Sequence, residues 1–129
     1  MLIGHITSGD DALLPIGFPS NAGILRREGV VDTGFNGSVS VPLSFIRRIG
    51  WIDRGTETYE LANGKRVSER IYLGDVLFDG RRRRVLALGN FGHDILIGTR
   101  LLAGRICEFD YVTRMVRIRR GGVLRRSSQ

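Results

Sequence analysis

The sequence predicts a single all-β domain whose strands form a closed or sandwich-like sheet, with two short helices. Eighteen glycines against only three prolines in 129 residues indicate many tight turns between short strands. Apolar runs of strand length, about nine in all, lie between these turns, and only two stretches repeat their apolar residues at helical spacing. The length suits one domain with one hydrophobic core.

The first half of the chain predicts four strands and one helix. The strands cover residues 2–7, 12–18, 24–31 and 39–41. Pro15 lies in the second strand, and because proline cannot donate a hydrogen bond to a neighbouring strand, we expect that strand at a sheet edge or a bulge. Residues 26–29 are polar, which predicts a solvated first half for the third strand. Pro42 and the apolar spacing after it predict a short amphipathic helix that stops at Gly50.

The second half predicts three hairpins. Asn63-Gly64 lies between two alternating runs and is a strong hairpin signal, so we expect a protruding hairpin there. Asp79-Gly80 predicts a second turn of the same kind. The three hairpins pair residues 56–61 with 66–73, 76–78 with 82–88, and 105–110 with 114–119.

A buried apolar run at residues 95–97 precedes the last hairpin. It is broken at Gly98, and a short helical pattern follows. The predicted domain therefore covers residues 1–120, and residues 121–129 are expected to form a basic, flexible tail.

Charge and composition narrow the classes of function. The net charge is +7, with nineteen arginines and one lysine, a balance that suits an anionic partner. Four arginines run from Arg81 to Arg84, where the simplest interpretation is a solvated strand edge protected by charge. No aromatic residue is interleaved with these arginines or with those at positions 117, 119, 120, 125 and 126, so stacking on bases is not indicated and we expect no nucleic-acid partner.

Compartment and cofactors can also be anticipated. The chain has no run of about 18 apolar residues and no signal-peptide pattern at its start, so we expect a cytoplasmic protein without a membrane partner. Cys107 is the single cysteine and suits a reducing compartment. His5 and His93 are not at ligand spacing from cysteines or acids, so we expect neither a metal nor another cofactor.

The stretch from Val30 to Gly34 carries the strongest functional signal. Two β-branched residues end in Asp32, Thr33 and Gly34, so a core strand delivers a carboxylate to a sharp turn. Taken alone, this pattern also fits an ordinary strand that ends in an Asx turn.

Together with two further motifs, the stretch resembles the retropepsin-like aspartic proteases, which include the retroviral proteases and small bacterial relatives. The motifs are Asp32-Thr33-Gly34, the hairpin at Asn63-Gly64, and the hydrophobic run that ends in Ile97-Gly98 before a short helix. The resemblance covers most of residues 1–119 and implies a closed, barrel-like acid-protease fold.

The resemblance also implies roles for individual residues. Asp32 would be the catalytic aspartate, with Thr33 and Gly34 shaping its loop, and Ile97 and Gly98 would support that loop from beneath. The hairpin tip would be a flap that closes over an extended peptide substrate; its residues are Ala62, Asn63, Gly64 and Lys65.

This chemistry predicts a two-fold homodimer. Amide hydrolysis by carboxylates needs one group to accept a proton from water and another to supply one to the carbonyl oxygen. Two carboxylates about 3 Å apart divide these roles because they cannot both ionise. The sequence contains one Asp-Thr-Gly only, so the second aspartate is expected to be Asp32 of another copy.

Two departures from the family leave a second hypothesis open. Phe35 follows the motif where a small residue is usual, and the hairpin tip carries Lys65 and Arg66 instead of a glycine-rich sequence. The lead hypothesis is an aspartic endopeptidase. The alternative is a catalytically silent module of the same fold that binds an extended peptide or an acidic partner.

Overall fold

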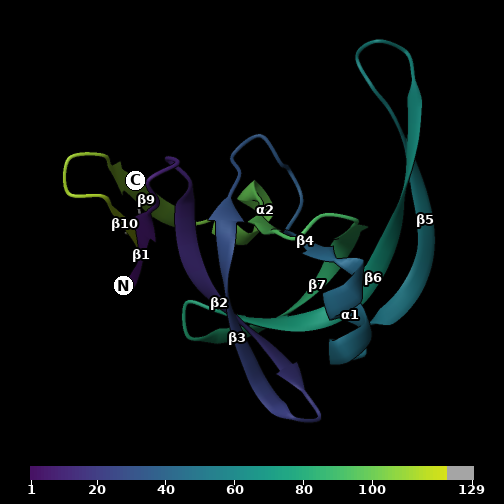
Figure 1. Cartoon of the computed structure of the whole chain (residues 1–129), viewed down its shortest axis with the longest axis horizontal. Helices are drawn as coiled ribbons and strands as arrows, with labels where there is room; N and C mark the ends of the chain where they lie inside the picture. The colour runs from purple at the N-terminus through teal and green to yellow at the C-terminus, as the bar shows by residue number, and fades with distance from the viewer. Residues whose placement is uncertain (122–129) are drawn as a thin grey trace, which may run out of the picture.

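The computed structural model describes residues 1–121, which form ten strands and two short helices (Figure 1). In chain order the elements are β1 (Leu2–Ile6), β2 (Ala12–Ser20), β3 (Gly23–Val31), β4 (Val39–Pro42), α1 (Leu43–Ile49), β5 (Ile52–Glu60), β6 (Arg66–Phe78), β7 (Arg81–Asn90), β8 (Ile95–Ile97), α2 (Thr99–Leu102), β9 (Arg105–Asp110) and β10 (Met115–Arg120). The predicted tail lies outside the described residues, apart from Gly121. Neither helix within residues 1–121 has the length and apolar character needed to cross a membrane.

The strands form one sheet that closes on itself. The sheet order is β5-β6-β7-β4-β8-β3-β2-β1-β10-β9. Gly17 of β2 pairs both with Arg26 of β3 and with Leu77 of β6, so the sheet closes into a ring of six strands. The result is a closed barrel of β2, β3, β4, β6, β7 and β8, which confirms the all-β closed fold with two short helices.

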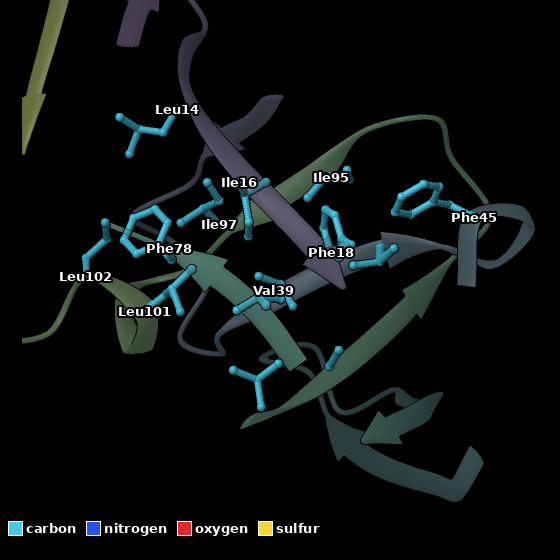
Figure 2. Packing of buried hydrophobic residues seen from close by; sticks show 14 of the residues in the cluster. Leu14, Ile16, Phe18, Val39, Phe45, Phe78, Ile95, Ile97, Leu101 and Leu102 are labelled. Carbon is cyan, nitrogen blue, oxygen red and sulfur yellow. The ribbon is translucent and has the colours of Figure 1, made fainter. Parts of the chain in front are cut away.

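The core fills this barrel with alternating side chains from its strands. Phe18 and Phe78 are fully enclosed, and Figure 2 shows them among aliphatic residues from β2, β4, β8 and α2. Phe45 of α1 packs edge-on against Phe18, with ring centroids 5.0 Å apart. Each such buried side chain contributes about 1.5–3 kcal/mol. Helix α1 ends, as predicted, at Gly50, whose φ of +70° is favourable for glycine.

The prediction that β2 lies at a sheet edge or a bulge is wrong, since its register with β3 is also unbroken from Leu13 to Ser20. This strand is interior, with β3 along one side and two partners in succession along the other. On that second side, β1 pairs as far as Leu13 and β6 pairs at Gly17. Pro15 lies between these two pairings, so its missing N–H is tolerated within an interior strand.

The predicted break between residues 73 and 76 is also wrong. Strand β6 runs without interruption for 13 residues, because β7 pairs with it from Ile71 to Phe78. The turn after it is as predicted, and Asp79 and Gly80 both have positive φ, as a two-residue hairpin turn requires. The solvated first half of β3 is likewise confirmed, since residues 23–28 are exposed or only half-buried.

The β5–β6 hairpin protrudes from the barrel as an arm. All nine residues of β5 are exposed, and Figure 1 shows the arm rising beside the loop between β3 and β4. Its tip closes through hydrogen bonds from the Leu61 amide to the Lys65 carbonyl oxygen and from the Gly64 amide to the Leu61 carbonyl oxygen. The arm has no hydrophobic core of its own.

Candidate functional site: the Asp32 loop and the adjoining cleft

Asp32 is the first residue after β3, at the end of this barrel strand. Strand β8 lies between β3 and β4, parallel to the first and antiparallel to the second, so that Ile97 is paired with both Val31 and Val39. The Asp32 amide donates to the Ile97 carbonyl oxygen at 2.9 Å, which extends the pairing by one residue. The backbone at Asp32 is therefore held by the barrel.

The rest of the loop is tied to the start of α2. The Gly98 amide donates to the Ser38 carbonyl oxygen (2.8 Å), and the Thr99 amide donates to the Phe35 carbonyl oxygen (2.9 Å). The Arg100 amide donates to the carbonyl oxygen of Gly37 at 3.1 Å. Ile97 and Gly98 thus lie against the loop that carries Asp32, and their role as supports of a catalytic loop stays a prediction.

The Asp32 carboxylate is held on one side only. Its Oδ1 accepts a hydrogen bond from the Gly34 amide at 2.9 Å, and the Phe35 amide donates to the Asp32 carbonyl oxygen at 3.1 Å. The hydrogen bond that forms the Asx turn is therefore also the one that positions the Asp32 carboxylate. Thr33 is exposed, and its hydroxyl has no hydrogen-bond partner within residues 1–121.

Asp32 differs from most other aspartates of the described chain in having no cationic partner. Its second carboxylate oxygen accepts no hydrogen bond from residues 1–121. Five other aspartates each pair with arginine: Asp10, Asp53, Asp75, Asp79 and Asp110. An anionic oxygen left free at the end of a barrel strand is available to a ligand or a second chain.

A cleft of about 710 Å³ opens between the Asp32 loop and the arm. Residues of the arm and of the adjoining strand β7 line it, together with the start of α2. Phe35 to Ser38 line the cleft, but Asp32 does not. The predicted flap residues at positions 62–65 are at the exposed tip of the arm, outside the lining.

Side chains of both charges line the cleft. Glu57 and Glu69 face each other in register on the arm, and the Tyr59 hydroxyl donates to Glu57 Oε2 at 2.9 Å. Partial burial, followed by the hydrogen bond to Glu57, raises the pKa of Tyr59. Arg83, Arg84 and Arg100 are the cationic side chains of the lining. Sequence reasoning did not select these residues, although the period-two alternation of the arm could have placed Glu57 and Tyr59 on one face.

The run of arginines at positions 81–84 is largely engaged within the fold. Residues 81–86 of β7 pair with β6 alone, so this part of β7 is an edge, as predicted. Arg82 and Arg84 both donate to Asp75, and Arg83 donates to the Leu101 carbonyl oxygen at 3.0 Å. Burial lowers the pKa of Arg83, and the nearby charge of Arg105 lowers it further.

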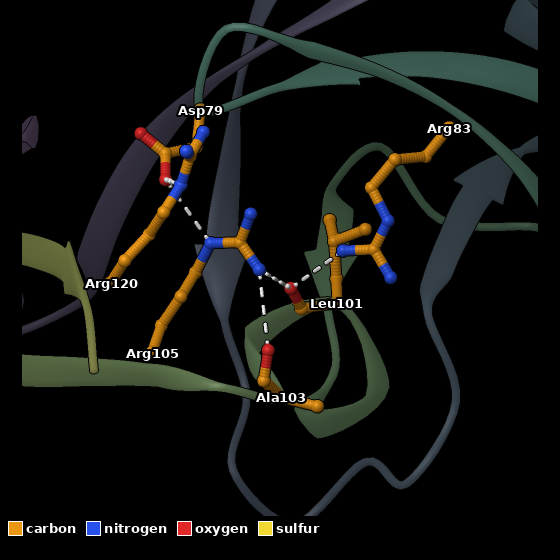
Figure 3. Close-up of polar contacts among 6 residues, drawn as sticks. All are labelled: Asp79, Arg83, Leu101, Ala103, Arg105 and Arg120. Atoms are coloured by element: carbon orange, nitrogen blue, oxygen red, sulfur yellow. Dashed lines mark hydrogen bonds and ion pairs between the residues drawn. The ribbon is translucent and has the colours of Figure 1, made fainter. Parts of the chain in front are cut away.

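A buried ion pair connects the turn between β6 and β7 to α2 and β9. Figure 3 shows Asp79 against Arg105, whose Nε donates to Asp79 Oδ2 at 3.2 Å while Nη1 donates to the carbonyl oxygens of Leu101 and Ala103. Arg120 approaches the same carboxylate oxygen at 3.9 Å. This cluster positions α2, and through α2 the Asp32 loop.

No model of a known protein family matches the chain, and no curated protein sequence matches it. Within residues 1–121, no three His, Cys, Asp or Glu side chains are grouped so that they could hold a metal ion. The fold and the site therefore define a class by geometry alone. It is a closed six-stranded barrel with an unpaired aspartate on a loop beside an open, charged cleft.

Proposed function

We propose that this protein is an aspartic endopeptidase of the retropepsin type, active as a two-fold homodimer that pairs Asp32 of one copy with Asp32 of the other. The observation that carries the proposal is the Asp32 carboxylate itself. Its backbone is bonded to β8, one oxygen is bonded to the Gly34 amide, and the other has no partner within residues 1–121. A rigidly held acid with a free oxygen suits a shared active site.

The pair would supply both roles that amide hydrolysis needs. Two such carboxylates about 3 Å apart share one proton, because both cannot be ionised at that distance. The ionised Asp32 takes a proton from the attacking water, and the protonated one donates to the carbonyl oxygen of the peptide. Glycine at position 34 leaves space beside the Asp32 carboxylate, since a Cβ there would lie 3.3 Å from Asp32 Oδ1.

The cleft and the arm would hold the peptide in an extended form. The arm presents backbone hydrogen-bonding groups on its exposed edge strand β5, and an extended peptide can pair with such an edge. Its tip, Ala62 to Lys65, would act as a flap that limits water around the scissile bond. No cofactor takes part in this mechanism.

Cleavage of a diverse peptide library tests the activity. Wild-type protein is incubated with the library from acidic to neutral pH, and products are identified by mass spectrometry. We expect Asp32→Asn to abolish cleavage, because an amide cannot accept the proton. Asp11→Asn is the matched control, since Asp11 is an exposed aspartate in the turn between β1 and β2, and it should cleave as the wild type does. Equal cleavage by wild type and Asp32→Asn would refute the mechanism.

Subunit mixing tests the pairing of two copies. Adding an excess of inactive Asp32→Asn to wild type should suppress cleavage, because most wild-type chains then sit in mixed dimers with one aspartate. The Asp11→Asn variant added in the same amount should not. Activity that is unaffected by the excess, or a strict monomer in sedimentation at the assay concentration, would contradict a shared site.

One observation favours the alternative of a silent peptide-binding module. Phe35 lines the cleft and Asp32 does not, so a peptide bound in the cleft would contact Phe35 and not the carboxylate. In that case the cleft would bind an extended peptide or an acidic partner without cleaving it. Peptides that bind the wild type and Asp32→Asn equally, with no cleavage by either, would select this alternative.

A further inference from the structure

A second, smaller pocket lies at the other end of the barrel, away from the Asp32 loop. It has a volume of about 230 Å³ and is formed where β3, α1 and the loop before β8 meet. Arg27 of β3 lines it, five residues before Asp32, which corresponds to roughly 17 Å along an extended strand. The pocket is therefore separate from the cleft of the proposed peptidase.

Two arginines from different elements line this pocket. Arg27 and Arg48 lie over the same ring, that of Phe45, with their Cζ atoms 5.0 Å and 6.0 Å from its centroid. The ring is buried and fixed by its edge-on contact with Phe18, which is visible in Figure 2. The two cations are thus placed by a rigid part of the core and by cation–π attraction.

Neither guanidinium is neutralised by the described chain. No carboxylate of residues 1–121 forms an ion pair with Arg27 or Arg48. The one hydrogen bond that Arg27 donates goes from Nη1 to the Arg26 carbonyl oxygen at 2.8 Å. Most of the N–H groups of the two side chains remain available. A bound anion would offset the repulsion between the two like charges.

The remaining lining is compatible with an anion. Ser44 and His93 contribute a hydroxyl and an imidazole, and no acidic side chain lines the pocket. The nearest acid on β3, Glu28, is paired with His5 at 3.4 Å. Asp94 follows His93 in sequence but is outside the lining. The polar side chains of the lining are therefore two arginines, a serine and a histidine.

We propose that this pocket binds a phosphate group, either free or as the phosphomonoester of a small molecule. Arginine presents planar pairs of donors that match the oxygens of phosphate, and two arginines can engage two edges of it. The volume is below the roughly 300 Å³ at which pockets begin to enclose a drug-sized ligand, so the group itself, rather than a large body, occupies the site. The proposal is independent of the peptidase activity.

Phosphate titration of the purified protein tests the proposal. Binding is followed by the ¹H chemical shifts of His93 and by the midpoint of thermal unfolding, at constant ionic strength set with chloride. We expect a saturable shift of the His93 signals and a rise in the midpoint that depends on phosphate concentration. Phenyl phosphate, a phosphomonoester, is titrated beside inorganic phosphate. Tighter binding of the ester assigns the site to a phosphorylated small molecule, and equal or weaker binding assigns it to the free ion.

Two double variants with the same charge change provide the contrast. Arg27→Gln with Arg48→Gln should weaken phosphate binding by about tenfold or more for each arginine lost. Arg26→Gln with Arg47→Gln, exposed neighbours outside the lining, should bind phosphate nearly as the wild type does. Equal weakening of phosphate binding in both double variants would show that net charge alone causes the effect, and it would overturn the proposed site. If Arg27→Gln with Arg48→Gln fails to fold, the wild-type titration decides, because a non-saturating His93 shift overturns the proposal by itself.

Discussion

Gly98 lies so close to Gly37 that a Cβ added to Gly98 would come within 2.1 Å of the Gly37 carbonyl oxygen. The same carbonyl oxygen accepts the hydrogen bond from the Arg100 amide. The contact places the start of α2 directly against the loop that begins at Asp32. Glycine is needed at position 98 for lack of space, since its φ of −96° is open to any residue.

The first prediction follows from this contact. Gly98→Ala should destabilise the fold by roughly 2–3 kcal/mol, because the methyl group would meet backbone atoms that cannot rotate away. Chemical denaturation measures the change. Gly9→Ala is the control, since a Cβ there would find only the Thr7 hydroxyl, at 3.9 Å, and its effect should stay within about 0.5 kcal/mol. A Gly98→Ala protein as stable as the control would show that the loop can move freely.

The second prediction concerns Asp75 and the dependence of stability on pH. Hydrogen bonds from Arg84 and Arg82 lower the pKa of Asp75 below its ordinary value of 3.8. A carboxyl whose pKa is lower in the folded protein stabilises the fold above its unfolded-state pKa, and this stabilisation is lost as the pH falls through the folded-state pKa. Asp75→Asn should therefore cost about 1 kcal/mol at neutral pH, and the difference from wild type should shrink below pH 3.8.

Urea unfolding of both proteins over a pH series checks this. The expected loss is small because Arg82 and Arg84 are mostly exposed and solvent screens their charges. Asp11→Asn should give a difference from wild type that is small at every pH. A constant difference for Asp75→Asn down to the most acidic pH would mean that shape, rather than charge, accounts for its effect.

The third prediction concerns the buried pair of Arg105 and Asp79. Their side chains are 9% and 12% exposed, so Arg105→Met would leave a carboxylate with little access to water and only the more distant Arg120 as a partner. We expect a loss of about 3 kcal/mol in the free energy of unfolding.

Replacing both partners tests whether the stranded charge is the cause. Arg105→Met combined with Asp79→Asn should recover part of the loss, because no ionised group then remains buried. Arg119→Met on the exposed face of β10 is the matched control and should change little. A double variant no more stable than Arg105→Met would trace the loss to the hydrogen bonds with Leu101 and Ala103 instead.

Several elements could be predicted from the local sequence because interactions between residues close together in the chain determine them. Alternating apolar and polar residues, with the positive φ of Gly64 and Gly80, produce the hairpins at these two glycines. Gly50 ends α1, the helix directly before it in the chain. The position of Asp32 at the end of a core strand was predictable for the same reason. At Pro15 the local pattern misled because β6, which is distant in sequence, pairs with β2 and closes the barrel. At residues 73–76 it misled because the next strand, β7, pairs with β6 along the whole stretch.

Local chemistry along the chain was thus sufficient to establish an all-β protein, its turns and the loop that carries Asp32. The tertiary structure alone decided that Gly17 meets Leu77 and closes the barrel, that Phe35 rather than Asp32 lines the cleft, and that Arg27 and Arg48 share one ring. These relationships join segments far apart in sequence. They depend on which strands pair and in what register, and no residue carries that information within its own neighbourhood.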